Sequence, residues 1–384
     1  MSDFDLLIEF IRESYPENKE IFLHEPVMGE IEKKYLLDCI DSGFVSSVGE
    51  YVSKAEKKIA EMAGSKYAVC MSSGTAALHI ALLVCGVGKN DLVLTQPLTF
   101  VATANAVKYC NAEPLFLDID EKTLSLSPEA LEYFFKKSSI QKNGECFYKG
   151  SGQKISACVP MHTFGHIGEI DKICQICARY NVPVIEDAAE AVGSFYKGRH
   201  GGTYGKAGIF SFNGNKIITS GGGGAVITDD KNFAELASHL STTARKVNTL
   251  SHEHDMIGYN YRMPNINAAF LSAQLHQLDE FVEKKRKLAK EYKKICDKSG
   301  FLFFEEPENC ISNFWLNSVF FQDAKEAQNF LYESRKHSIF PRMVWKPLHL
   351  LDIFRKNQYN NLNVTQNIYK RIINLPSSIP EGGM

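Results

Sequence analysis

Between residues 66 and 230, short apolar runs alternate with stretches of helical character. The runs are bounded by Gly, Pro or Asn, and many of them are apolar throughout instead of alternating with polar positions. Strands with this pattern are buried on both faces of a largely parallel sheet. The pattern therefore predicts an α/β sheet covered by helices on both sides, with candidate strands at 67–71, 92–95, 113–117, 157–161, 182–185, 208–212 and 224–228.

Apolar residues at helical spacing flank this region on both sides. They predict a short helix at 4–14, two amphipathic helices at 31–41 and 52–63, and a long helical region from Asn265 to about Ser299. The least patterned segment, 138–153, is expected to form an exposed hairpin or a mobile loop.

The length of the chain predicts more than one domain. At 384 residues it exceeds the size at which a single hydrophobic core stops growing. We expect an N-terminal arm at 1–28, a large α/β domain at 29–264, and a bridging helix with a smaller α+β domain at 265–384.

Charge and composition exclude several kinds of partner. The formal net charge is −2, whereas binding to nucleic acid or to a membrane surface would need a basic field. The chain contains no run of twenty apolar residues, so no membrane span is predicted. The first residues lack the basic and apolar regions of a signal peptide. The sequence therefore predicts a cytoplasmic protein with no nucleic-acid or membrane partner.

The ten cysteines indicate reduced thiols. Cys174 and Cys177 form a CxxC pair, but that spacing also describes one face of a helix and no second pair exists, which disfavours zinc. His252 and His254 lack the helical spacing of a metalloprotease motif and are interpreted as part of a solvated loop. No metal site is expected.

The strongest chemical candidate is Lys216. It ends the stretch Phe-Ser-Phe-Asn-Gly-Asn-Lys, in a turn of small polar residues between two apolar strands and before the glycine run 221–224. An amine held at the floor of a cleft can form a Schiff base with a carbonyl, as the lysines that hold pyridoxal phosphate (PLP) do. The alternative is a surface lysine in a loop.

Small residues after the first strand predict a phosphate site. The run Ser72-Ser-Gly74-Thr75 leads directly into a helical stretch, so free amide groups and the positive helix end would point into the crevice at the strand ends. The alternative is a serine that only caps the helix.

Two residues near another strand end supply carboxylates. Asp187 ends the run Val-Pro-Val-Ile-Glu-Asp, and Glu190 follows three residues later. Asp187 is a candidate partner for a protonated pyridine nitrogen. The same spacing also matches a helix capping box, and the two readings are compatible.

Two further positions are weaker candidates on their own. Phe100 follows a strand and precedes small residues, so it could stack on a flat cofactor or belong to the core. Asn260 lies among aromatic residues in a turn before a long helix, which is also an ordinary loop pattern.

Together these motifs resemble the DegT/StrS-type sugar aminotransferases, which are fold-type I PLP enzymes. The resemblance runs from about Pro26 to Pro376. Its motifs are Ser-Ser-Gly-Thr-Ala-Ala-Leu, Thr-Phe-Val-Ala-Thr-Ala-Asn, Ile-Glu-Asp-Ala-Ala-Glu, Phe-Ser-Phe-Asn-Gly-Asn-Lys, Gly-Tyr-Asn-Tyr-Arg-Met and Trp-Lys-Pro-Leu-His. It implies a mostly parallel seven-stranded large domain and a smaller C-terminal domain.

The resemblance also implies a role for each candidate residue. Lys216 would be the Schiff-base lysine and proton shuttle, and Asp187 would hold the pyridine nitrogen. Glu190, where the family usually has Gln or His, would lie near the ring hydroxyl. The remaining cofactor contacts would be the stacking residue Phe100, the phosphate ligands Gly74, Thr75 and Ser211, and Asn260 of the partner subunit in a homodimer with shared active sites.

Within the family, the lysine motif with its four glycines and the turn Val45-Ser-Ser-Val-Gly49 resemble the legionaminic acid and bacillosamine branch. The implied reaction aminates C4 of a nucleotide-linked 4-keto-6-deoxy-N-acetylhexosamine, with L-glutamate as donor.

The sequence leaves several alternatives. The nucleotide on the sugar can be UDP or GDP. A 3-keto sugar is the alternative substrate, and a non-catalytic PLP-binding regulator is an alternative of another class. A nucleotide-binding module is disfavoured, because the chain has neither a dinucleotide nor a P-loop pattern.

Overall fold

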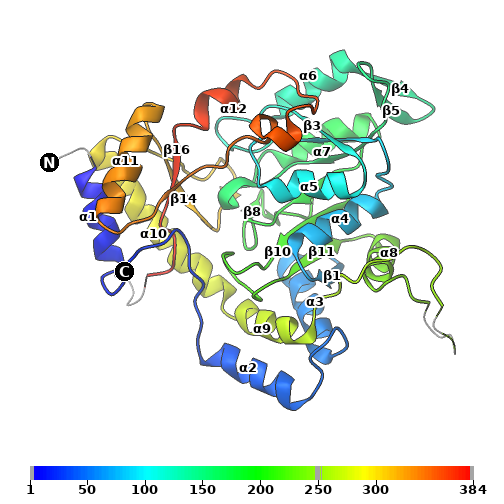
Figure 1. Cartoon of the computed structure of the whole chain (residues 1–384), viewed down its shortest axis with the longest axis horizontal. Coiled ribbons are helices and arrows are strands. Elements are labelled where there is room, and N and C mark those ends of the chain that lie inside the picture. The colour runs from blue at the N-terminus through cyan, green and yellow to red at the C-terminus, as the bar shows by residue number, and fades with distance from the viewer. Residues whose placement is uncertain (1–3, 247–250, 252, 381–384) are drawn as a thin grey trace.

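Seven strands form the central sheet of the larger part of the molecule (Figure 1). The structure is a computed structural model that describes residues 4–246, 251 and 253–380. Two hydrogen-bonded groups of strands are joined by parallel bridges from Cys158 to Val184 and from Met161 to Asp187. Across the sheet the order is β3 (Glu113–Phe116), β2 (Leu92–Thr95), β6 (Ile155–Val159), β7 (Ile185–Asp187), β10 (Ala207–Ser211), β11 (Gly224–Thr228) and β1 (Tyr67–Met71).

The directions of these strands confirm the predicted mostly parallel sheet. The five strands from β3 to β10 run parallel, and only β11 is antiparallel to its two neighbours. β6, β10 and β11 are buried at every residue, as their uninterrupted apolar sequences predict. The carboxyl ends of the parallel strands consequently meet at one edge.

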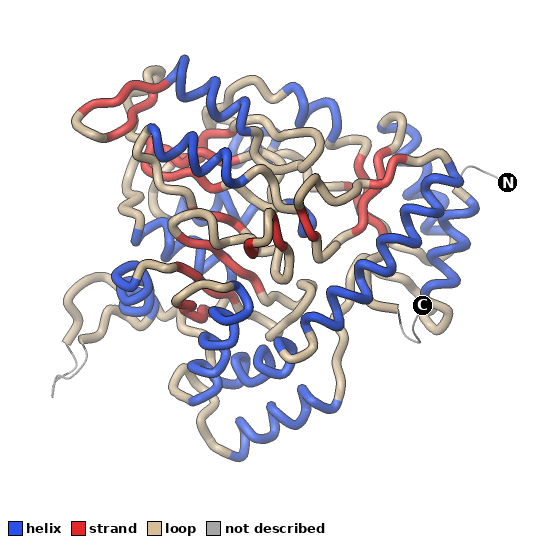
Figure 2. The backbone as a smooth tube through the Cα atoms, turned by 180° about the vertical axis from the view of Figure 1, so that it is seen from behind, coloured by secondary structure: helices blue, strands red, loops and turns tan. Residues whose placement is uncertain are grey.

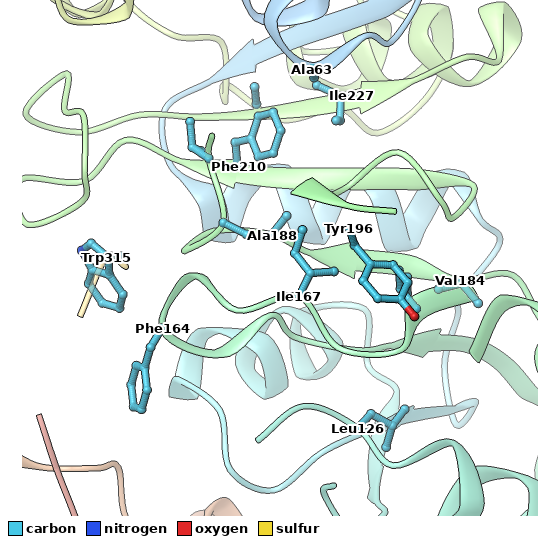
Figure 3. Close-up of a cluster of buried hydrophobic side chains, with 14 of the residues drawn as sticks. Ala63, Leu126, Phe164, Ile167, Val184, Ala188, Tyr196, Phe210, Ile227 and Trp315 are labelled. Carbon is cyan, nitrogen blue, oxygen red and sulfur yellow. The ribbon is translucent and has the colours of Figure 1, made fainter. Parts of the chain in front are cut away.

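Helices cover both faces of the sheet. Successive residues of β1 show the alternation, since Val69 and Met71 join one hydrophobic cluster and Cys70 joins the other. One face carries α4 (Gly74–Val84), α5 (Val101–Tyr109) and α8 (Lys231–Ser241). The other carries α3 (Glu50–Ala63), α6 (Pro128–Ser138), α7 (Ile170–Arg179) and α9 (Asn265–Leu275). Figure 3 shows part of the second cluster, in which Phe210 of β10, Ile227 of β11 and Ala63 of α3 are labelled.

Four strands have bounds that differ from those predicted: β3 ends one residue earlier, β10 is shifted by one residue, and β6 and β7 differ further because of prolines. β6 ends at Val159 and not at Met161, since Pro160 has no amide hydrogen to continue the ladder. β7 begins at Ile185 and not at Val182, because Pro183 interrupts the pairing before it. The difference places Asp187 as the last residue of β7.

The C-terminal part of the chain forms a second, antiparallel sheet. Its strand order is β12 (Leu302–Phe303), β14 (Asn317–Phe320), β16 (Ile372–Leu375) and β15 (Arg342–Met343). It packs with α10 (Leu278–Ser299), α11 (Ala324–Lys336) and the N-terminal helix α1 (Asp5–Ser14) in one hydrophobic cluster. The predicted long helical region is therefore two helices, α9 and α10, separated at His276 and Gln277. Figure 1 shows them leading from the large sheet toward the small one.

The remaining elements lie around these two sheets. The segment 138–153 forms the predicted hairpin, which projects from the molecule (Figure 2). The elements not yet given are α2 (Glu30–Asp41), β4 (Ser139–Lys142), β5 (Glu145–Tyr148), η1 (Thr163–Gly165), β8 (Phe195–Tyr196), β9 (Arg199–His200), β13 (Cys310–Ile311), η2 (Leu348–Leu350), η3 (Asp352–Phe354) and α12 (Asn363–Ile368).

The described residues contain neither a cluster of potential metal ligands nor a helix long and apolar enough to cross a membrane. All ten cysteines are free thiols, and Cys174 and Cys177 lie on α7 as the helical reading of their spacing predicted. His252 lies outside the described residues, and Nδ1 of His254 donates a hydrogen bond to the backbone oxygen of Thr243 at 2.9 Å.

Candidate active site

A cavity of about 460 Å³ lies at the carboxyl ends of the parallel strands. The large domain lines it with residues that follow β1, β2, β6, β7 and β10, and the C-terminal unit closes the other side. Ligands of open α/β sheets bind at this edge. A smaller cavity of about 290 Å³ lies where β10 begins and β11 ends, and its Lys206 and Asp230 already pair with each other. The cavity at the carboxyl ends of the strands is therefore the candidate active site.

The side chain of Lys216 enters this cavity from the turn that follows β10. Its Nζ lies 3.2 Å from Oε1 of Glu190 and 4.0 Å from the centre of the Trp315 ring. The indole of Trp315 is itself fixed, because its Nε1 donates to the backbone oxygen of Asn215 at 2.8 Å. The side chain of Lys216 is only 12% exposed, so the interpretation of Lys216 as a free surface lysine is wrong.

Asp187 lies at the floor of the cavity, at the end of β7. The hydroxyl of Thr103 donates to its Oδ2 at 2.8 Å, and the amide of Ala189 donates to its Oδ1 at 3.3 Å. The capping-box reading of Asp187 and Glu190 is wrong, because a series of turns and not a helix follows β7. The two hydrogen bonds orient the carboxylate toward the cavity and keep it from turning into the sheet.

Glu190 occupies a fully buried position beside the amine. Its Oε2 accepts the amide hydrogen of Phe164 at 2.9 Å, and its Oε1 faces Lys216. Burial raises the pKa of Glu190 to about 7, although Lys216 and the Phe164 amide act in the opposite direction. Proton occupancy of this carboxyl group therefore changes near neutral pH.

This raised pKa predicts a pH-dependent stability for the PLP-free protein. Between the ordinary value of 4.5 and about 7, the folded state binds more protons at Glu190 than the unfolded state does, so stability falls as pH rises through this range. Replacing the residue (Glu190→Gln) removes the titrating group. The free energy of unfolding of the wild type should therefore fall by about 2–3 kcal/mol relative to the variant between pH 5 and pH 8. Urea titrations at both pH values measure this difference, and a constant difference would contradict the prediction.

Small residues at the start of α4 form a cradle beside the lysine. The side chain of Ser73 caps the helix by accepting the amide hydrogen of Ala76 at 3.1 Å. Ser73 therefore does cap the helix, as one of the two interpretations predicted. The amides of Gly74 and Thr75 in the first turn have no carbonyl partner within the helix, and both residues line the cavity. A β-carbon on Gly74 would lie 2.9 Å from the Cβ of Ser211, so the two chain segments meet closely. Amide groups gathered at a helix N-terminus suit a phosphate.

Gly224 is essential to the shape of this cradle. A β-carbon there would lie 2.4 Å from the backbone nitrogen of Gly74, which cannot move without shifting the start of α4. Gly224→Ala should lower the free energy of unfolding by about 1–3 kcal/mol and weaken PLP binding by about tenfold. Gly88→Ala is the control, because its β-carbon would meet nothing closer than 4.0 Å. Equilibrium PLP titration and urea denaturation test the pair, and wild-type PLP affinity in Gly224→Ala would contradict the prediction.

The structure gathers most of the predicted site residues, but not all of them. Seven of the eight line the same cavity, namely Gly74, Thr75, Phe100, Asp187, Glu190, Ser211 and Lys216. Phe100 is half exposed there, immediately before α5. Asn260 is exposed and does not line the cavity of its own chain.

Two buried histidines that follow β6 lie outside the cavity. His162 is buried and pairs with Glu186 at 2.9 Å. His166 is buried against Phe304 and Phe314, and burial lowers its pKa to about 3. Neither residue contributes to the cavity wall, and the contacts of both are with other protein groups.

The wall contributed by the C-terminal unit was not predicted from the sequence as part of the site. It consists of Trp315, Leu316, Arg342, Met343, Trp345 and Asn374. Only Trp345 belonged to a noted motif, and the others carry no local sequence signal, because the second sheet brings them to the cavity from separate strands and loops. Thr103, which orients Asp187, was also within a noted motif but had no assigned role.

The residues of the cavity fit a phosphorylated pyridine aldehyde. The amine of Lys216 can reach a carbonyl, Asp187 offers a buried carboxylate, and the amides of Gly74 and Thr75 at the start of α4 offer donors for a phosphate. Together with the seven-stranded sheet, this defines the class of protein: a fold-type I enzyme that uses PLP.

Comparisons with known proteins agree with this class. EpsN of Bacillus subtilis strain 168, named "Putative pyridoxal phosphate-dependent aminotransferase EpsN", is 37% identical over 365 residues, which cover 94% of this chain and 91% of EpsN. GDP-perosamine synthase of Escherichia coli O157:H7 is 36% identical and covers 94% of this chain and 93% of its own. The crystal structure of the aminotransferase TlmJ from Streptoalloteichus hindustanus superposes with a TM-score of 0.83 at 26% identity, covering 93% of both chains.

The family is established by residues 26–380, which match the DegT/DnrJ/EryC1/StrS aminotransferase family. The chain belongs to this family, and it is a PLP-dependent aminotransferase.

Proposed function

We propose that the protein transfers the amino group of L-glutamate to C4 of a nucleotide-linked 4-keto-6-deoxy-N-acetylhexosamine. The observation that carries the transamination is the placement of Lys216 and Asp187 around one cavity. The nucleotide sugar is supported by the family and by the relative named for GDP-perosamine. The N-acetylated 4-keto sugar rests on the resemblance of the lysine motif and of the turn at 45–49 to the legionaminic acid and bacillosamine branch.

The cavity residues divide between holding the cofactor and positioning the reacting groups. Gly74, Thr75 and Ser211 would hold the PLP phosphate, and Phe100 would stack on the ring. Asp187 would pair with the pyridine nitrogen and Glu190 would lie near the ring hydroxyl. When bound, PLP supplies an electron sink that takes up the charge left when a proton leaves the donor carbon.

Lys216 is then the group that moves protons. When PLP is bound, the Nζ of Lys216 would take the proton from Cα of glutamate and would give it back to complete the transfer. Glu190 and Trp315 confine the amine to a small volume, since one accepts from it at 3.2 Å and the other packs beneath it at 4.0 Å. The reverse sequence on the sugar ketone uses the same atoms.

Two tryptophans help to exclude water from these proton transfers. Trp315 and Trp345 both line the cavity on the side of the C-terminal unit, and Leu23 and Leu316 add further apolar surface. A drier site strengthens the electrostatic contacts of Asp187 and of the lysine.

The proposed homodimer would complete the site. Asn260 is exposed in its own chain, which leaves it free to serve as Asn260 of the partner subunit. Exposed apolar side chains on α2 and the turn after it, at Leu37, Ile40, Phe44 and Val48, offer a surface for such an association. Light scattering of the purified protein tests the dimer, and loss of PLP affinity in Asn260→Ala with the dimer intact tests the shared site.

The test of the proposed reaction begins with an absorbance spectrum of the PLP-loaded protein. A yellow band that L-glutamate bleaches would establish the donor half-reaction. UDP- and GDP-linked 4-keto and 3-keto sugars are then added, and the aminated product is identified by mass spectrometry and NMR. If only a 3-keto sugar restores the yellow band, the amino group is transferred to C3 and not to C4. A band that no amino acid bleaches would favour a non-catalytic PLP-binding regulator.

A further inference from the structure

A buried histidine on α4 has aromatic contacts but no polar ones. His79 is 3% exposed, and neither of its ring nitrogens has a hydrogen-bond partner among the described residues. Burial lowers its pKa, so the ring is neutral near pH 7. The ring meets three tyrosines edge-on, with centroid distances of 4.9 Å to Tyr259, 5.7 Å to Tyr109 and 6.0 Å to Tyr261. Because buried polar groups are normally hydrogen-bonded, these ring contacts are what His79 contributes.

Two of these tyrosines flank Asn260, the residue proposed to complete the site of a partner subunit. The backbone of 259–261 is hydrogen-bonded on both sides, to the end of α8 and to the residue that follows β1. An antiparallel bridge at Asn260 shows that the segment is extended, so successive side chains point to opposite sides. Since the rings of Tyr259 and Tyr261 both lie against His79, the side chain of Asn260 points outward, where it is exposed.

The histidine thereby joins two parts of the proposed shared site. It belongs to α4, the helix whose first turn forms the cradle for a phosphate in its own chain. It also supports Tyr259 and Tyr261, which stack on each other with their centroids 5.1 Å apart. Removal of the imidazole would leave a space beside both tyrosine rings, and the segment that presents Asn260 would lose its support on that side.

We propose that His79 is a positioning residue for Asn260, and that its contacts with Tyr259 and Tyr261 aim this asparagine at the phosphate site of the partner subunit. The inference rests on the proposed function, because Asn260 has a ligand only where two subunits share their sites. It specifies where a change at His79 acts. PLP binding is weakened in the other subunit and not in the subunit that carries the change.

Hybrid dimers with two affinity tags separate these two effects. Lys216→Ala in one chain removes the yellow band of that chain, so the band reports PLP binding at the other site alone. In the trans hybrid, His79→Ala is in the chain with Lys216→Ala, and in the cis hybrid it is in the chain that keeps Lys216. Relative to the hybrid with both histidines intact, the trans hybrid should bind PLP about tenfold more weakly, as expected for a misplaced hydrogen bond to a charged group. The cis hybrid should bind PLP with unchanged affinity.

Three further variants complete the experiment. Asn260→Ala in the trans hybrid should weaken PLP binding at least as much as His79→Ala does. His79→Phe, which keeps an aromatic ring at this position, should restore most of the affinity. His166→Ala is the matched control, because His166 is also buried without a polar partner, but its ring contacts Phe304 and Phe314. This control should cause no loss in the trans hybrid.

An unchanged PLP affinity in the trans hybrid, or a loss confined to the cis hybrid, would overturn the proposal if the dimer is intact and Asn260→Ala is effective in trans. An Asn260→Ala variant without a trans effect would instead remove the shared site from the proposed function, and the role of His79 with it. If His79→Ala does not fold, Tyr259→Leu replaces it, because it removes the ring nearest to His79. The same trans loss is then expected, and its absence counts equally against the proposal.

Discussion

Lys216→Ala is expected to lower multiple turnover by about a thousandfold or more, because the variant loses both the covalent anchor for PLP and the amine that moves protons. The variant should still bind PLP through the cradle at the start of α4 and through Asp187, which the substitution leaves untouched. Its absorbance spectrum should therefore resemble that of the free aldehyde and lack the yellow band of the lysine-bound cofactor. Stopped-flow absorbance with L-glutamate measures the loss.

Lys172→Ala is the matched control for this experiment. Lys172 lies on α7, is half exposed and pairs with Glu169 on the surface. The control should retain the wild-type band and rate. Repeated turnovers by Lys216→Ala, with PLP bound, would show that another group moves the proton and would remove Lys216 from its proposed role.

Asp187→Asn is expected to cause the second largest loss, about a hundredfold or more in kcat. An asparagine keeps the shape and can still accept the hydrogen bond from Thr103, so the fold should persist. It cannot supply the negative charge that would hold a proton on the pyridine nitrogen. The half-reaction with L-glutamate should slow while PLP remains bound, and rapid-scanning absorbance follows both properties in one experiment.

Thr103→Val separates the charge of Asp187 from its orientation. Valine removes the hydroxyl that donates to Oδ2 at 2.8 Å but leaves the carboxylate in place. The expected loss is about tenfold, the size of one hydrogen bond to a charged group. A loss in Thr103→Val as large as that in Asp187→Asn would mean that position, and not charge, is what Asp187 contributes.

The sheet was largely predictable because each strand carries its own signal. Runs such as 224–228 are buried at every position and almost wholly apolar, and a strand buried on both faces needs that pattern wherever it lies in the sheet. The largest errors fell at Pro160 and Pro183, where the apolar run continues but the missing amide hydrogen changes the pairing. The separation of α9 from α10 was also missed, because the apolar spacing of the two helices reads as continuous.

The half of the site that follows the parallel strands was predictable for a related reason. Gly74, Phe100, Asp187 and Lys216 each come directly after a predicted strand, and the carboxyl ends of parallel strands must meet at one edge. The order of the strands along the chain was therefore enough to predict that these four residues lie close together. It did not give the pairing of Lys216 with Glu190 or the packing of its amine on Trp315, because both depend on how turns and loops fold back over the strands.

By itself, the sequence determined the α/β architecture. It also determined that Gly74, Phe100, Asp187 and Lys216 lie at one edge of the sheet, since both features depend on local patterns and on short connections. Only the tertiary structure decided which residues form the opposite wall of the cavity. The second sheet brings Trp315, Arg342, Trp345 and Asn374 to the cavity from segments at least 99 residues beyond Lys216. Their placement follows from long-range packing of β14, β15 and β16, and no local pattern encodes it. The raised pKa of Glu190 is decided in the same way, because burial is its main cause and burial exists only in the folded chain.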